Sequence, residues 1–319
     1  MASELSVAVV IPSWNSAGLL PRCLDSLADQ GAELELLVVD NGSGDGSVEL
    51  LRERGVPHVS LPQNVGFAAA VNLGAARTKA PAVLALNADT VLEPGAVGRL
   101  AAALAADPEL GGVQPRILQL EPGGERDAER ARLYSRGMAL SADGRAFEEG
   151  AGEAQDSRSA TAREVFGVCG AACLLRRELF ERLGGYDERY FAFYEDVDLN
   201  VRARIAGWRF AYVPEAVVWH LGNATWMAEA PSPGAWNARL VARNRLATQA
   251  KFMPARSLPR IAAVEAGALA RAARQRRLRA TLGGKLAALR WLPALLGERR
   301  QLRREGDPRL AQRWLGVRN

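Results

Sequence analysis

Cysteine and histidine are scarce in this chain of 319 residues, which contains three cysteines and two histidines. Cys23, Cys169 and Cys173 are odd in number and far from a paired spacing, so they exclude a disulfide framework like that of small secreted domains. Cys169 and Cys173 lie in an apolar stretch without a neighbouring histidine or a second cysteine pair. We therefore interpret them as reduced thiols that pack as small hydrophobic residues rather than as half of a metal site.

Long hydrophobic runs are also absent, although 48% of the residues are hydrophobic. No window approaches the roughly 18 uninterrupted apolar residues that indicate a membrane-spanning helix. The first five residues include an acid and lead into a short strand-like run, unlike the basic start and apolar stretch of a signal peptide. From these absences we expect a cytoplasmic protein without a membrane-spanning helix.

Two common nucleotide-binding motifs are missing as well. The sequence contains neither G-x-G-x-x-G nor G-x-x-x-x-G-K-[ST], which argues against a Rossmann dinucleotide site and against a P-loop. Any nucleotide is therefore expected to be bound by another arrangement of residues.

Charge is distributed unevenly along the chain. The net charge is +5, but residues 243–319 contain 19 Lys and Arg against 4 Asp and Glu, a balance of +15. Residues 1–242 carry the other 22 basic and 32 acidic residues, a balance of −10. A basic tail predicts an anionic partner, either nucleic acid or the anionic lipid of a cytoplasmic leaflet.

The first part of the chain alternates apolar strands with helices. Residues 7–11, 36–39 and 83–86 are continuous apolar runs, as expected for strands buried on both faces. Helical patterns follow the last two runs, over 47–54 and from Pro94 onward. This alternation predicts an α/β fold with a mostly parallel sheet flanked by helices, which binds ligands at the carboxyl ends of its strands.

The later segments differ in composition. Residues 121–160 are rich in Gly, Glu, Arg, Ala and Ser, so we expect a mobile surface excursion, with a hairpin around Asp143-Gly144. From residue 257 onward the pattern predicts two Ala/Leu/Arg helices, the second interrupted at Pro293. We therefore divide the chain into one large α/β domain over 1–250 and a basic helical extension over 251–319.

Polar side chains follow two of the predicted strands directly. Asp40 comes after residues 36–39, and Asn87-Ala88-Asp89 comes after residues 83–86. A divalent ion bound to a nucleoside diphosphate needs only one or two protein ligands, because phosphate oxygens and waters complete its shell. Asp89 could be such a ligand, although residues of these types are also ordinary turn and cap residues.

His220 follows a further apolar run over 216–219. A lone histidine after a strand is commonly packed and hydrogen-bonded, and we interpret His58 in that way. If His220 lies near Asp89, its neutral imidazole could complete the shell of an ion such as Mn²⁺.

Glu195 and Asp196 begin a predicted helix whose apolar positions recur at helical spacing. The helix dipole favours acids in the first turn whatever their function. A carboxylate is also the group that removes a proton from an attacking hydroxyl, and negative charge stabilises an oxocarbenium-like transition state. We therefore choose Asp196 as the candidate base, and we expect Asp198 to face elsewhere because positions i and i+2 do not share a helix face.

Together these motifs resemble family 2 glycosyltransferases, most closely their bacterial rhamnosyltransferase-like branch. The resemblance covers about residues 5–250. It is carried, in order, by Pro12-Ser13-Trp14-Asn15, Asp40-Asn41-Gly42-Ser43, Asn64-Val65-Gly66-Phe67-Ala68 with Asn72, Leu86-Asn87-Ala88-Asp89, Gly170-Ala171-Ala172, Gly185-Tyr186-Asp187-Glu188, Glu195-Asp196-Val197-Asp198 and His220. It implies a GT-A fold, in which a nucleotide half and an acceptor half form one catalytic domain, and an inverting transfer by single displacement.

The resemblance also implies site residues, position by position. It assigns Asp196 as the catalytic base, Asp89 and His220 as ligands of Mn²⁺ or Mg²⁺, and Tyr194 and Glu195 to the acceptor side. It assigns the nucleotide-sugar to Pro12, Asn15, Asp40, Asn64, Gly66, Phe67, Asn72, Asn87, Ala88 and Asp89. One position departs from the family pattern, because Asn87 stands where many members have Asp. This departure predicts weaker metal binding or binding chiefly through Asp89, and not inactivation, since the Asn form is familiar in the rhamnosyltransferase-like branch.

The implied activity is metal-dependent transfer of a sugar to a glycan or lipid-linked acceptor in cell-surface polysaccharide biosynthesis. The first expectation for the donor is dTDP-rhamnose, followed by UDP-hexoses. Two alternatives remain on this fold, a binding protein without turnover and a sugar nucleotidyltransferase. The nucleotidyltransferase would need a Gly-rich basic loop near the N-terminus, which is missing.

The basic tail carries no nucleic-acid recognition motif, so we expect no nucleic acid as partner. Its leucines and arginines fit a helix that lies on anionic lipid, which would place the protein peripherally on the inner face of the membrane. They fit equally a pair of helices packed on the catalytic domain or on the second copy of a homodimer.

Overall fold

A mixed β-sheet forms the centre of the computed structural model, which describes residues 5–121, 126–127, 130–222 and 233–316. The strand order is β10-β12-β6-β11-β4-β1-β2-β3, with β5 paired to β12 and β7 paired to β6. The bounds are β1 (Val7–Ser13), β2 (Leu34–Asp40), β3 (His58–Ser60), β4 (Ala82–Leu86), β5 (Thr90–Leu92), β6 (Leu110–Gln119), β7 (Leu133–Ser135), β10 (Arg163–Val165), β11 (Ala172–Arg176) and β12 (Arg209–His220).

The N-terminal half of the sheet is parallel, as the sequence predicted. β1 pairs in parallel with β2 and with β4. Val9 and Ile11 pack into the core on one face of the sheet and Val10 into the core on the other, which explains the uninterrupted apolar run. The helices here are α1 (Leu20–Asp25), α2 (Ser47–Glu53), α3 (Phe67–Arg77) and α4 (Ala96–Ala106). β11 runs antiparallel to β4 and to β6, so the whole sheet is mixed.

The described part of the segment over 121–160 contains the expected hairpin. β8 (Met138–Leu140) and β9 (Ala146–Glu148) form a hairpin that turns at Asp143-Gly144. Its few large apolar side chains are well placed, since Leu133, Met138 and Leu140 are all buried. An average over forty residues hides this pattern, because a short strand needs only one or two apolar residues on its inner face.

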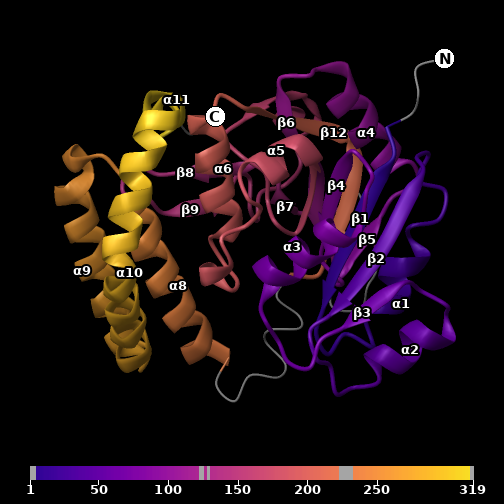
Figure 1. Cartoon of the computed structure of the whole chain (residues 1–319), viewed down its shortest axis with the longest axis horizontal. Helices are drawn as coiled ribbons and strands as arrows, with labels where there is room; N and C mark the ends of the chain where they lie inside the picture. The colour runs from indigo at the N-terminus through magenta and orange to yellow at the C-terminus, as the bar shows by residue number, and fades with distance from the viewer. Residues whose placement is uncertain (1–4, 122–125, 128–129, 223–232, 317–319) are drawn as a thin grey trace.

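In the part of the chain that the structure describes, four α-helices follow the sheet and lie together on one side of the molecule, coloured orange to yellow in Figure 1. They are α8 (Pro233–Phe252), α9 (Leu258–Arg274), α10 (Leu278–Glu305) and α11 (Pro308–Gln312). The sequence pattern did not reveal α8, which packs along α10. The boundary expected at residue 250 therefore falls in the last turn of α8. Among the described helices none has the length and apolarity to cross a membrane.

The interruption expected at Pro293 is wrong, because α10 continues through this residue. A proline inside a helix removes one hydrogen bond and leaves the carbonyl four residues earlier without its partner. Pro293 and Leu289 are both exposed, so water can satisfy that carbonyl. The opposite side of α10, at Ala288 and Leu295, is buried and holds the helix in place.

A buried ion network joins these helices to α6 (Glu195–Ile205). Asp198 on α6 is fully buried, and its carboxylate accepts hydrogen bonds from Lys251 Nζ at 2.7 Å and from Arg202 Nε at 2.5 Å. Lys251 on α8 also lies 2.9 Å from Glu298 on α10. Asp198 thus faces away from Asp196, as expected. Because the network spans three helices, it holds α6 in a defined position.

Replacing Lys251 by Met is expected to lower the free energy of unfolding by about 3–5 kcal/mol, because it leaves buried carboxylates without their cation. Urea unfolding would measure this. Arg54→Met, which breaks the exposed pair of Arg54 with Asp25, is the control and should cost less than about 1 kcal/mol. Equal losses in the two variants would contradict this role of the network.

The same network predicts a pH dependence of stability. Burial alone would raise the pKa of Asp198, but Lys251 and Arg202 outweigh it and hold the pKa below its usual value. The stabilisation is therefore present above the unfolded pKa of about 3.9 and is lost as the pH falls through the folded pKa. Lys251→Met should lose less stability on acidification than the unaltered protein.

Candidate active site

A cavity of about 340 Å³ opens at the carboxyl ends of β1 and β4, the expected edge of the sheet. Residues from several distant motifs line it together. Those predicted from the sequence are Pro12, Asn64, Phe67, Asn87, Ala88, Asp89, Tyr194, Glu195, Asp196 and His220. The structure therefore brings the candidate metal ligands and the candidate base to one cavity.

The ladder between β5 and β12 places His220 beside Asp89. In its register His220 is opposite Thr90, and the Leu221 N–H donates to the Asp89 carbonyl oxygen at 3.1 Å. His220 Nε2 lies 3.0 Å from Asp89 Oδ1 and 3.2 Å from the side-chain nitrogen of Asn87. The His220 side chain is only 2% exposed, and the ring of Tyr134 packs edge-on against it with the centroids 4.4 Å apart.

The chemistry of this pair fits a divalent cation. His220 Nε2 and Asp89 Oδ1, 3.0 Å apart, are close enough that both atoms would contact one ion. An imidazole nitrogen beside a carboxylate oxygen is also a set of donor atoms that binds divalent first-row metals. Asn87 could add an oxygen ligand if its amide were reversed, since amide orientation is assigned from the surrounding hydrogen bonds.

Asp196 faces the cavity from the first turn of α6, which starts after Tyr194 in a left-handed conformation (φ 71°). The Gly170 N–H donates to Asp196 Oδ2 at 2.9 Å, and the Val197 N–H donates to Oδ1 at 2.7 Å. Burial raises the pKa of Asp196 above its usual value, and these two donors oppose the rise. Asp196 is therefore a carboxylate with increased basicity at a fixed position, as a general base requires.

Glu195 lies beside Asp196 and is only 6% exposed. Its Oε2 atom is buried and has no hydrogen-bond partner among the residues that the structure describes. Burial, and then the charge of Asp196, raise the pKa of Glu195 well above its usual value. A buried carboxyl oxygen at the wall of a cavity is a ready partner for a ligand hydroxyl.

Two predicted nucleotide residues build the loops behind the cavity and do not line it. The Asp40 carboxylate accepts hydrogen bonds from Gly42 N–H at 3.2 Å and Ser43 N–H at 3.1 Å. Asn15 Oδ1 accepts one from Gly44 N–H at 2.8 Å. The Asp40 side chain therefore shapes the turn after β2, and Asn15 holds that turn against the loop after β1.

Two further predicted residues are also outside the cavity lining. Asn72 bonds through its amide to the backbone N–H and carbonyl of Tyr186, both at 2.9 Å, and so ties α3 to the loop before α6. Gly66 precedes α3 with φ 93°, and a Cβ atom there would lie 2.5 Å from the Phe191 carbonyl oxygen. Only glycine fits this position, since it combines positive φ with close backbone approach.

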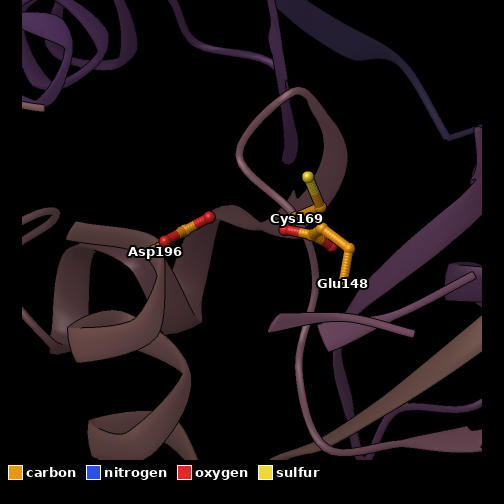
Figure 2. A group of neighbouring side chains, drawn as sticks. All are labelled: Glu148, Cys169 and Asp196. Atoms are coloured by element: carbon orange, nitrogen blue, oxygen red, sulfur yellow. The ribbon is translucent and has the colours of Figure 1, made fainter. Parts of the chain in front are cut away.

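Glu148 and Cys169 are cavity residues that sequence reasoning missed. Figure 2 shows both side chains together with Asp196, and one ligand atom from each lies within 4.8 Å of the others. Burial raises the pKa of the Cys169 thiol well above its usual value, so the thiol is protonated and a poor metal ligand. No sequence signal marks Glu148, because it lies in a segment without a recognisable motif and reaches the cavity only through the β8–β9 hairpin.

A mixed sheet flanked by helices, with an Asp-His pair and the Asp196 carboxylate at one cavity, is the arrangement of a glycosyltransferase. Residues 8–184 match the family model described as Glycosyl transferase family 2. The chain belongs to this family.

The chain is similar to relatives that are named for the transfer of different sugars. One relative is an N-acetylglucosaminyl-diphospho-decaprenol L-rhamnosyltransferase of Mycobacterium tuberculosis, to which this chain is 30% identical over 230 residues. The aligned region covers 66% of this chain and 75% of that protein. A second relative is an N-acetylglucosaminyltransferase of Mesorhizobium japonicum, to which this chain is 33% identical over 229 residues. This aligned region covers 66% of this chain and 50% of that protein.

Solved structures share the fold. The mannosyltransferase PcManGT from Pyrobaculum calidifontis, in complex with GDP-Man and Mn²⁺, matches with a TM-score of 0.53 and 20% identity over 96% of this chain and 84% of that one. This likeness confirms the GT-A architecture that the sequence predicted.

Proposed function

We propose that this protein transfers a sugar with inversion from a nucleoside diphosphate donor to a sugar hydroxyl of a glycan or lipid-linked acceptor, in cell-surface polysaccharide biosynthesis. The observation that carries the proposal is the convergence of Asp89, His220 and Asp196 on one cavity. Asp89 and His220 would hold Mn²⁺ or Mg²⁺, which neutralises charge on the diphosphate leaving group when bound.

The roles of the chain's own residues follow from their positions. Asp196 accepts the proton of the acceptor hydroxyl as the hydroxyl oxygen attacks the anomeric carbon. The bond from that carbon to the diphosphate breaks at the same time, and its electron pair leaves with the nucleoside diphosphate. Pro12, Asn64 and Phe67 form the donor wall of the cavity, and Tyr194 and Glu195 form the acceptor side.

We propose dTDP-rhamnose as donor, supported by the resemblance to the M. tuberculosis relative, with a UDP-hexose as the second candidate. Thermal-shift measurements with a panel of nucleotide-sugars, each with and without Mn²⁺, would test this. The expected result is the largest rise in Tm for dTDP-rhamnose with Mn²⁺, because a ligand that binds only the folded state stabilises it. A larger rise with a UDP-sugar would reassign the donor, and binding without any product would favour a non-catalytic protein.

We further propose that α10 binds the anionic inner face of the cell membrane, where a lipid-linked acceptor would be available, which places the protein in the cytoplasm. Helix α10 carries five exposed leucines, spaced by four, four, three and seven residues along the chain. Residues at these spacings lie on one face of a helix. The leucines are Leu278, Leu282, Leu286, Leu289 and Leu296. Exposed arginines accompany this leucine stripe, namely Arg279, Arg290, Arg300, Arg303 and Arg304. An apolar stripe with basic neighbours is typical of a helix that lies on anionic lipid.

Leu286 and Leu289 are 64% and 52% exposed. Replacing both by Glu is expected to abolish flotation of the protein with phosphatidylglycerol vesicles. Flotation with phosphatidylcholine vesicles should be low for both the unaltered protein and the double variant. The control is Leu258→Glu on α9, at a site 61% exposed and outside the leucine stripe. Point variants are preferable to deletion of the helices, because α10 packs along α8. The membrane proposal fails if the unaltered protein does not float but sediments as a dimer, and the double variant sediments as a monomer. In that case a second copy of the chain covers the leucine stripe.

A further inference from the structure

Glu148 enters the candidate active site from an element that lies outside all the recognised motifs. It is the last residue of β9, and it lines the cavity opposite Asp196. The Ser135 hydroxyl donates to Glu148 Oε2 at 2.6 Å and anchors the carboxyl group from β7. One carboxyl oxygen of Glu148, one carboxyl oxygen of Asp196 and the Cys169 Sγ atom all lie within 4.8 Å of one another.

Two carboxyl groups at this separation take different protonation states. Burial, and then the negative charge of Asp196, raise the pKa of Glu148 to about 8, against the hydrogen bond from Ser135. Asp196 accepts two backbone N–H donors, which favour its ionised form. The backbone donors therefore favour the ionised form of Asp196, while burial and the charge of Asp196 favour the protonated form of Glu148, an arrangement in which paired carboxyl groups take separate roles.

The remaining groups around Glu148 do not supply a cation. Cys169 is a protonated thiol, and the neighbouring Glu149 is paired with Arg163 on the other side of the strand. Tyr134, next to Ser135, has its pKa raised above its usual range by burial and by nearby acids, so its hydroxyl is neutral. No ion pair joins Glu148 to a Lys, Arg or His among the residues that the structure describes, so its carboxyl group is left to interact with a ligand.

The spacing suits a sugar. A hydroxyl oxygen bonds to a carboxyl oxygen at about 2.7 Å, and adjacent hydroxyls of a sugar lie at a similar distance from each other, so one such pair can bridge two carboxyl groups less than 5 Å apart. A neutral carboxyl both donates and accepts hydrogen bonds, as a hydroxyl does. The unpartnered Oε2 of Glu195 offers a third contact to the same ligand.

We propose that Glu148 binds the acceptor sugar at the hydroxyl next to the one that Asp196 deprotonates. The acceptor would then be a sugar with two adjacent free hydroxyl groups, one the nucleophile and the other held by Glu148. This inference rests on the proposed function, since it needs Asp196 to act on an acceptor hydroxyl. It assigns an acceptor-binding role to the β8–β9 hairpin.

The test uses the full chain, dTDP-rhamnose, and a synthetic N-acetylglucosaminyl diphospho-lipid as the acceptor probe. Glu148→Ala should raise the acceptor KM and weaken probe binding in calorimetry by at least about ten-fold, the effect of one lost hydrogen bond to a ligand, while donor KM stays unchanged. Glu148→Gln, which still donates and accepts, should recover part of this loss. Glu153→Gln, in the same segment but outside the cavity, is the control and should match the unaltered protein.

A pH profile separates this role from a structural one. For the unaltered protein, kcat/KM for the acceptor should fall as the pH rises above about 8, because Glu148 then loses its proton and places a second negative charge beside Asp196. Glu148→Gln should lack this alkaline limb. The proposal is overturned if the limb persists in Glu148→Gln, if probe binding is the same in Glu148→Ala, or if the unaltered protein does not bind the probe.

Two further outcomes are informative. A higher Mn²⁺ requirement in Glu148→Ala would overturn the proposal in favour of a metal site at Glu148, Cys169 and Asp196. Failure of the unaltered protein to bind or turn over any nucleotide-sugar would overturn the proposed function instead, so the two failures are distinguishable.

Discussion

Replacing Asp196 by Asn is expected to lower kcat by about 10²–10⁴-fold, the range that a general base contributes. Asparagine has nearly the same shape as aspartate but cannot take a proton from the acceptor hydroxyl. Pro12 and Phe67 of the donor wall lie on β1 and α3, whereas the substitution is on α6. Turnover with dTDP-rhamnose should therefore collapse, while calorimetry should show unchanged binding of the nucleotide-sugar with Mn²⁺.

The controls for this variant follow from its hydrogen bonds. The Asp196 carboxylate accepts from both Gly170 and Val197, and an amide can accept only one of these bonds through its oxygen. Tm should therefore be compared with that of the unaltered protein before kcat is interpreted. Asp25→Asn, at an exposed position on α1, is the matched control and should retain full activity. A correctly folded Asp196→Asn protein with near-normal kcat would remove Asp196 from the mechanism.

Replacing His220 by Ala is expected to raise the Mn²⁺ concentration needed for half-maximal activity by at least about ten-fold, because one of two proposed protein ligands is lost. His220 Nε2 lies 3.0 Å from Asp89 Oδ1, so the remaining carboxylate would hold the ion alone. Activity titrations with Mn²⁺, together with the paramagnetic signal of free Mn²⁺ as a direct measure of binding, would quantify the change.

The chain offers a matched control for this experiment, since its other histidine lies elsewhere. His58 begins β3, and its Nδ1 lies 2.8 Å from the Val56 carbonyl oxygen. His58→Ala should leave the Mn²⁺ titration unchanged. If the curves of the two variants coincide, His220 does not bind the ion, and Asp89 with the donor phosphates would have to suffice.

The parallel half of the sheet could be predicted from the sequence because its evidence is local. Buried parallel strands are continuous apolar runs, and polar residues placed directly after them must lie at the ligand edge. Asp89 and His220 could be selected in this way, and Asp196 could be selected by its place in the first turn of a helix, together with the motifs of a known family. Their contact could not be derived from spacing, since His220 reaches Asp89 only through the register of β5 with β12.

The remaining differences between the sequence predictions and the structure have specific physical causes. Glu148 carries no motif, and the average composition of its segment concealed three buried apolar residues. Pro293 suggested a break in α10, but an exposed proline on a helix supported by α8 costs too little to end it. Asn72 and Asp40 are family positions, yet their side chains satisfy backbone groups of neighbouring loops, which only the three-dimensional arrangement reveals.

The sequence by itself determined the fold class, the family and the identity of the proposed base and metal ligands, because these depend on residue type and on local order along the chain. The tertiary structure decided which carboxyl groups share one cavity and in which direction the pKa of each is shifted, since both depend on burial and on distances between segments far apart in sequence. It also decided that the basic C-terminal helices pack beside the catalytic helix α6 through the buried Asp198–Lys251 pair, while one leucine face of α10 stays exposed.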